Sequence, residues 1–380
     1  MSRLGRGTRR RWLIVAAVVL ALLLIKGVLL GSTSLKDLGQ RAQLPLLKQP
    51  ASIAYLQPGR KTVPFPKSAL PLKVGLELNN IYNLELEKQT FSADGWYWLE
   101  WTESLNEILH ARNIQPIKMI EFLNQVESWD SSFEPDTALP LRRSDGSYYQ
   151  LVRFSARFYI DDIDQHHSPF GGVVLPVVLE ARPESFQLSK LAVKLEPDRN
   201  QRRLLRNDGS LAGYQLKGAW VQEGSSSHDL FDVGENEIFS QLTVGVAYGA
   251  EPWSAFMKWI LPPLIVMVIV VLAPSLDSSL EEMRLAIPST ALLTLVFLQQ
   301  TYKGKLPSAA YLTFLDELYT YFYLVAVGMF ALFLWSSNRL EAAAPQDRDV
   351  VRMGLNRINS FCLWGVLAGQ VLVVILAWCL

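Results

Sequence analysis

The stretch 256–272 reads FMKWILPPLIVMVIVVL and contains a single charged residue, Lys258. An apolar run of about 17 residues or more with so few charges is typical of a helix that crosses a membrane. Three further apolar runs follow this one, and another lies near the N-terminus. The five runs are 13–30, 256–272, 285–302, 311–335 and 358–380. The sequence therefore predicts an integral membrane protein with four C-terminal spans.

The distribution of basic residues predicts the orientation of these spans. Five arginines precede the first run, and four lie in the segment 339–357. Cytoplasmic loops carry an excess of lysine and arginine, so both segments are expected inside. The large polar region and the C-terminus then lie outside. Lys303 and Lys305 depart from this pattern, because they fall in an outer loop. The first run is either a cleaved signal peptide or a permanent anchor.

Composition narrows the class of protein further. Half of the 380 residues are hydrophobic, as in many membrane proteins. The formal net charge is zero, so the composition lacks the excess of basic residues that is typical of nucleic-acid-binding proteins. Its two cysteines, Cys362 and Cys379, both lie in the last apolar run. The polar region therefore has no thiol for a disulfide or a zinc site. No Asn-x-Ser/Thr sequence occurs. These features favour a bacterial inner-membrane protein whose large domain lies in the periplasm or outside.

The polar region is predicted to be strand-rich. Prolines crowd residues 45–70, which indicates an extended linker. Large apolar residues then recur at every second position around 74–78, 96–101, 152–158, 173–179 and 242–248. This period of two is typical of half-buried strands, and such strands without intervening helices favour an antiparallel β-sandwich. The predicted domains are 1–34 (signal peptide or anchor), 35–70 (linker), 71–252 (extracellular β-sandwich) and 253–380 (four-helix transmembrane bundle).

No constellation of catalytic residues is found. The sequence has neither a phosphate-binding glycine loop nor a nucleophile elbow. His166 and His167 adjoin, but neighbouring side chains on a strand point apart, so solvated histidines are favoured over a metal pair. We therefore expect no enzyme, no cofactor and no metal site.

The helix predicted from Glu282 to Tyr302 carries a polar stripe. With about 100° per residue, seven side chains fall on or beside one narrow band. These residues are Glu282, Ala286, Ser289, Thr290, Leu293, Phe297 and Gln300. Several copies around an axis would form a pore with a carboxylate ring, a hydroxyl-lined stretch and an apolar constriction. The alternative is ordinary packing, with the polar residues joining neighbouring helices.

The same helix resembles the pore helix of pentameric ligand-gated (Cys-loop-type) channels. The resemblance continues through EEM (281–283), LLTL (292–295), LP (306–307) and YLT (311–313), and ILP (260–262) resembles the family's first transmembrane helix. In the polar region FSAD (91–94), followed by Trp96, Trp98 and Trp101, resembles the second strand. The segment 162–180, with SPF (168–170), resembles the signature loop and its next strand. The resemblance spans about residues 72–380.

The resemblance implies a homopentamer in a lipid bilayer, with a central pore for monovalent cations. With Pro307 as the anchor of the register, it places Leu293 at the hydrophobic gate and Glu282 at the acidic filter. Glu281 is the rival filter residue, because a one-residue slip exchanges the two. The loop lacks cysteines and the linker 336–359 is short, as in prokaryotic members. Ala250 stands where the family usually has an arginine, so that boundary salt bridge is in doubt.

Two further sets of residues follow from the resemblance. Gating is expected to pass through contacts between the signature loop and the loop after the pore helix, through charge pairs such as Asp164 with Lys305. The coupling residues are Asp162, Asp164, Pro169, Phe170, Lys303, Lys305 and Pro307. The ligand pocket is expected to contain Trp129, Phe186, Tyr214 and Phe231. Aromatic residues suit a cationic small molecule as the agonist. A second group of residues instead suits a proton as the agonist. Its members are Asp161, Asp162, Asp164, Glu235, Glu237, His166 and His167.

Two readings of function remain open from the sequence. The first is a subunit of a homopentameric, ligand- or proton-gated cation channel. The second is a membrane-anchored sensor or scaffold whose sandwich binds a partner and whose helices do not conduct. The polar stripe from Glu282 to Gln300 separates them, because an anchor does not need it.

Overall fold

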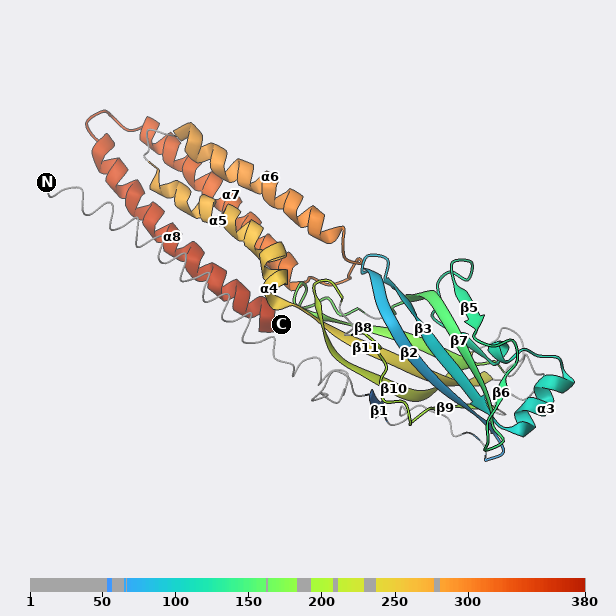
Figure 1. The fold of residues 1–380 in the computed structure, drawn as a ribbon. Coiled ribbons are helices and arrows are strands. Elements are labelled where there is room, and N and C mark those ends of the chain that lie inside the picture. The colour runs from blue at the N-terminus through green and yellow to red at the C-terminus, as the bar shows by residue number, and fades with distance from the viewer. Residues whose placement is uncertain are drawn as a thin grey trace. The chain divides into compact units, whose positions relative to one another are not determined.

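The structure is a computed structural model that describes residues 53–56, 65, 67–161, 163–182, 193–207, 211–228, 237–276 and 281–379. The chain divides into two units, each described by itself (Figure 1). The described part of the sheet unit lies within 53–163 and 172–250. The described part of the helical unit lies within 164–171 and 251–379. The predicted N-terminal apolar helix, and most of the linker predicted at 35–70, lie outside the described residues.

The sheet unit contains two sheets. The first has the strand order β1-β10-β11-β8-β4, and the second β5-β7-β3-β2-β9, with β6 added to β7. The first sheet consists of β1 (Ile53–Leu56), β4 (Ile120–Phe122), β8 (Gly172–Ala181), β10 (Tyr214–His228) and β11 (Glu237–Ala250). The second consists of β2 (Leu70–Glu85), β3 (Thr90–Trp101), β5 (Ser132–Pro135), β6 (Leu141–Arg142), β7 (Tyr148–Tyr159) and β9 (Val193–Pro197). Helix α3 (Glu103–Ala111) and a 3-10 turn (Pro116–Met119) separate β3 from β4.

The period-two prediction is confirmed by the burial of alternate residues. In β3, Tyr97, Leu99 and Trp101 are buried, whereas Trp96 and Trp98 are half-buried on the other face. The inward side chains of both sheets form one continuous core, which is why the alternation is so regular. The sequence thus correctly predicts a β-sandwich-like unit.

The sequence predicts a wholly antiparallel sandwich, and the structure differs from this prediction at two strand pairs. Strand β9 pairs with β2 in parallel, and β1 pairs with β10 in parallel. Hydrophobic alternation gives the face that each residue occupies but not the direction of the neighbouring strand, so these two pairings could not be anticipated. β1 and β9 are both short edge strands, and the long β2, β3, β7, β8, β10 and β11 pair antiparallel with one another.

The helical unit contains three helices that are long and apolar enough to cross a membrane, counted over the described residues. They are the continuous helix Pro252–Ser275, α7 (Phe314–Glu341) and α8 (Arg348–Cys379, of which the stretch to Ile375 qualifies). The first consists of α4 (Pro252–Ala255), a π-helical turn (Phe256–Ile260), α5 (Leu261–Leu272) and a 3-10 turn (Ala273–Ser275). Among the four predicted spans, the one at 285–302 falls outside this set.

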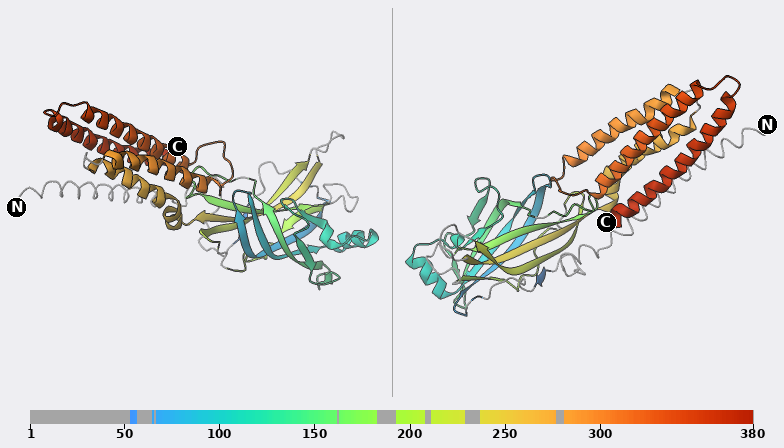
Figure 2. Two further views of the ribbon diagram at one scale, coloured as in Figure 1. Left: turned by 90° about the horizontal axis from the view of Figure 1, so that it is seen from above. Right: turned by 180° about the vertical axis from the view of Figure 1, so that it is seen from behind.

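That remaining segment forms α6 (Glu281–Lys303), a helix of 23 residues with Pro288 inside it. It is long enough to cross a bilayer, but its hydroxyl, amide and charged side chains make it less apolar than the other three. It packs against α5 and α7, and α7 packs against α8 (Figure 2).

The connection between α7 and α8 is much shorter than predicted. The sequence indicates a linker at 336–359, but α7 continues to Glu341 and α8 begins at Arg348. The hydrophobic pattern ends where the charged residues begin, whereas the helical backbone continues through them, since Ser, Asn, Arg and Glu are all compatible with a helix.

Candidate functional site

Helix α6 has one covered face and one uncovered face. The covered face carries five buried residues at helical spacing. They are Arg284, Pro288, Ala291, Leu295 and Tyr302. All seven residues of the predicted pore stripe are exposed within the single chain. Leu293 and Phe297 are 58% and 65% exposed. The side chain of the rival filter residue Glu281 lies outside the described residues.

Local contacts hold two hydroxyl groups close to their own helix, one on the exposed face at Ser289 and one beside it at the half-buried Thr294. Ser289 Oγ donates to the carbonyl of Leu285 at 3.0 Å, and Thr294 Oγ1 donates to that of Thr290 at 2.9 Å. Such bonds satisfy the hydroxyl protons while leaving oxygen lone pairs available to water. The covered face is fixed differently: the guanidinium of Arg284 lies 4.7 Å from the centre of the Phe333 ring on α7.

The C-terminal end of α6 is tied to the start of α7 by a buried carboxylate. Asp316 Oδ1 accepts a hydrogen bond from Gln299 Nε2 at 3.0 Å and lies 3.1 Å from Lys303 Nζ. Its second oxygen accepts from Thr313, which caps α7 and in turn accepts from the Asp316 backbone N–H. Gln299 Oε1 also accepts from the Tyr323 hydroxyl at 2.6 Å. We call Asp316, Gln299, Lys303, Thr313 and Tyr323 the α6–α7 clamp.

The loop 164–171 connects β7 to β8 in sequence but belongs to the helical unit. Its backbone forms two hydrogen bonds with the segment that follows α6. Gln165 N donates to the Tyr311 hydroxyl at 3.0 Å, and the His166 carbonyl accepts from Phe314 N, at the start of α7, at 2.8 Å. The His166 ring stacks on the Tyr311 ring, with centroids 3.8 Å apart and planes 2° apart. Side chains extend these contacts to both helices.

Two residues of the loop are buried against the helices. The hydroxyl of Tyr302 on α6 donates to Ser168 Oγ at 2.7 Å, in a buried bond. Phe170 belongs to the core of the helical unit and meets Phe314 edge-on at a centroid distance of 6.2 Å. Pro169, between them, and Pro307, in the α6–α7 connection, are both half-buried. The loop thus contacts α6, the connection and α7.

The predicted coupling charges have other partners in the structure. Asp164 Oδ1 lies 2.7 Å from His166 Nδ1 within the loop itself. Lys303 pairs with Asp316 in the clamp, and Lys305 Nζ lies 5.7 Å from the centre of the Trp259 ring. Asp162 lies outside the described residues. The structure therefore brings the loop to the α6–α7 connection through aromatic and backbone contacts instead of the Asp164–Lys305 pair.

The predicted ligand residues are only partly described. Trp129 lies between β4 and β5 and is 84% exposed. Tyr214 begins β10 and is half-buried, and burial raises the pKa of its hydroxyl. Phe186 and Phe231 lie outside the described residues. The structure gives no contact that joins Trp129 to Tyr214, so within the described part of one chain these residues do not form a pocket.

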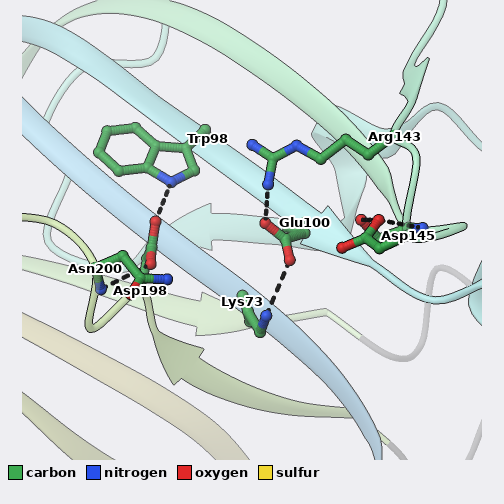
Figure 3. Close-up of polar contacts among 8 residues, drawn as sticks. Lys73, Trp98, Glu100, Arg143, Asp145, Asp198 and Asn200 are labelled. Carbon is green, nitrogen blue, oxygen red and sulfur yellow. Dashed lines mark hydrogen bonds and ion pairs between the residues drawn. The ribbon is translucent and has the colours of Figure 1, made fainter.

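A polar cluster lies on the outer face of the six-stranded sheet (Figure 3). The Glu100 carboxylate binds both Lys73, at 2.9 Å, and Arg143. Its hydrogen bond and charge raise the pKa of Lys73. Beside this pair, the Trp98 indole donates to Asp198 Oδ2 at 3.0 Å. Each charged group has a neighbour of opposite charge or a hydrogen-bond donor, so the cluster stabilises the sheet face and offers no reactive group.

A metal centre is not formed by the described residues, since no group of three or more His, Cys, Asp or Glu side chains converges there. The comparisons with known proteins add no assignment. Neither a family model nor a curated protein matches this chain.

Sequence reasoning missed the clamp and the aromatic contact of the loop. The clamp has a readable signal, because Thr313-x-x-Asp316 before an apolar run is a capping-box pattern that places Asp316 in the first turn of a helix. The contact between His166 and Tyr311 has no such signal. It joins residues 145 positions apart, and no short-range pattern specifies such a pair.

Proposed function

We propose that this chain is one subunit of a homopentameric, ligand- or proton-gated cation channel in a bacterial inner membrane, with α6 lining the pore. The observation that carries the proposal is the uncovered face of α6. Glu282, Thr290 and Gln300 would be costly to expose to lipid, because hydrocarbon offers them no hydrogen-bond partners. The same face must therefore meet water or other chains.

The order of side chains along that face suits a conduction path. Glu282 at one end supplies negative charge, Ser289 and Thr290 supply hydroxyl groups, and Leu293 and Phe297 supply an apolar ring that excludes water when narrow. A five-fold arrangement, the outward position of the sheet unit and the choice of cations rest on the resemblance to pentameric ligand-gated channels. The agonist is either a small cationic molecule or a proton.

The loop 164–171 supports a route from ligand to pore. It is covalently continuous with β7 and β8, and it contacts α6 through Ser168 and the start of α7 through His166. A displacement of the two strands would therefore be delivered to both helices. In this proposal the coupling depends on the contacts of Tyr302 and Tyr311 more than on exposed ion pairs, since such pairs contribute only about 0–1 kcal/mol.

The test is current across liposomes that contain the full chain, recorded over a pH sweep and a panel of small amines. Glu282→Gln is expected to lower the preference for cations over anions, whereas Glu341→Gln, an exposed glutamate at the end of α7, leaves it unchanged. Unchanged selectivity in both Glu281→Gln and Glu282→Gln would remove the filter assignment.

A second pair of variants tests the apolar ring. Leu293→Ser should make the constriction easier to wet and produce current at a weaker stimulus. Leu372→Ser on α8 is its matched control, because Leu372 is 57% exposed in the single chain and lies outside the proposed pore. No current from the wild-type chain under any condition, with the chain shown to be inserted and folded, would favour the sensor or scaffold instead.

A further inference from the structure

Two lysines from different elements converge on one indole ring. Lys258 lies in the π-helical turn at the start of the first span, and its Nζ is 5.1 Å from the centre of the Trp259 ring. Lys305, two residues after α6 ends, places its Nζ 5.7 Å from the same centre. The two ammonium groups therefore cannot be farther apart than the sum of these distances. We call Lys258, Trp259 and Lys305 the lysine–tryptophan site.

The charge of this site is not balanced by the described part of the chain. Lys258 and Lys305 are both exposed, and neither is paired there with a carboxylate. Lys303, in the same connection, differs because Asp316 neutralises it at 3.1 Å. Each lysine is held by the Trp259 ring, and an anion bound between them would be attracted by both charges. Lys305 is also one of the two lysines that depart from the predicted charge distribution.

The surroundings of the site indicate the kind of anion. Lys258 lies within the first two turns of the apolar helix Pro252–Ser275, where the span begins. Tryptophan is enriched at this level of a membrane, beside the lipid headgroups. Trp259 is fixed there by an edge-on contact with Tyr302 at 5.2 Å. In the same first turns of this helix, Trp253 and Met257 are 49% and 44% exposed, which provides apolar surface for acyl chains at the start of the span.

We propose that the lysine–tryptophan site binds the phosphate headgroup of an anionic phospholipid. Lysine ammonium groups bind phosphate as point charges, and an adjacent aromatic ring can pack against the glycerol region. The site lies beside the end of α6, so an occupied site also fixes the position of Tyr302 through Trp259. The inference requires the helical unit to lie in a bilayer, but it does not require the chain to conduct.

The test uses the full chain in mixed micelles with brominated phosphatidylglycerol or brominated phosphatidylcholine, and it measures quenching of tryptophan fluorescence. The contribution of Trp259 is the difference between the wild type and Trp259→Phe. We expect Trp259 to be quenched at a lower mole fraction of phosphatidylglycerol than of phosphatidylcholine. Lys258→Gln and Lys305→Gln should each weaken the apparent affinity for phosphatidylglycerol on the order of fivefold.

Controls separate this site from general surface charge and from misfolding. Lys303→Gln should leave the affinity unchanged, because Lys303 already has a partner. Lys258→Arg and Lys305→Arg should retain most of the binding, because they keep the charge. Equal quenching by the two lipids would overturn the proposal, as would an equal loss in Lys303→Gln. Competition by millimolar inorganic phosphate would assign the site to a soluble anion instead. A non-conducting chain that still binds phosphatidylglycerol would contradict only the channel function.

Discussion

Replacing Asp316 with asparagine should loosen the α6–α7 clamp. The carboxylate is only 11% exposed, and its Oδ1 meets Gln299 and Lys303 at about 3 Å. Asparagine removes the charge and presents an amide to groups that are themselves donors. A hydrogen bond to a charged group contributes about 1.5–3 kcal/mol, and the ion pair adds little because Lys303 is half exposed. We expect a loss of about 2 kcal/mol in the local opening free energy.

Amide hydrogen exchange measures this opening at the start of α7 without requiring channel activity. A loss of about 2 kcal/mol corresponds to exchange about 30-fold faster over residues 317–320, in the regime where exchange reports the opening equilibrium. The matched control is Glu317→Gln. It removes the same charge from the same helical turn, but the structure gives the Glu317 side chain no partner among the described residues.

A double-mutant cycle tests whether the effect acts through the clamp. Asp316→Asn and Gln299→Leu together should cost less than the sum of the single changes, because each weakens the same hydrogen bond between Gln299 and Asp316. Strict additivity would refute the reasoning. So would equal exchange rates in Asp316→Asn and Glu317→Gln, because the effect would then come from the charge at the helix N-terminus alone.

Two further predictions concern the sheet unit. Burial raises the pKa of Tyr97 and raises that of Tyr248 to about 12. In the unfolded chain these tyrosines ionise near pH 10, before they do so in the folded unit. The denaturant midpoint should therefore be constant up to about pH 10 and fall between pH 10 and 12. A midpoint that rises in this range would contradict the assignment. Gly95→Ala should destabilise the unit by about 2–3 kcal/mol, because a Cβ there would collide with the Glu77 carbonyl oxygen. Gly224→Ala, whose Cβ would meet Gln241 at an ordinary 3.8 Å, should have little effect in the same denaturant titration.

The parts of the fold that obey a short period could be predicted from the sequence. Alternation identified the strands β3 and β7 and, in β7, the apolar residues that are buried, and apolar length identified the three qualifying helices. The helical period also grouped the seven residues of α6 that prove to be exposed together. Periodicity succeeds in these cases because side chains about one turn apart in a helix, or two residues apart in a strand, lie on the same face and are buried or exposed together.

Features that depend on distant residues could not be predicted in this way. The parallel pairing of β2 with β9 and the stacking of His166 on Tyr311 are set by tertiary packing. The charge pair expected between Asp164 and Lys305 shows the same limit. Opposite charges in two facing loops predict attraction, but Asp164 has a closer partner in His166, and Lys305 turns to Trp259.

The assignment of loop 164–171 to the helical unit has a consequence for engineering. A chimaera that joins this sheet unit to a foreign set of helices could be cut once, at the end of the last strand. Here that cut, after Ala250, would leave Ser168 and Phe170 facing a surface that no longer supplies Tyr302 and Phe314. Within the described part of the chain three junctions are needed, at 163/164, 171/172 and 250/251, so that residues 164–171 stay with the helices they pack against. Within the described residues, the boundary between the two units therefore crosses the chain at three positions and not at one.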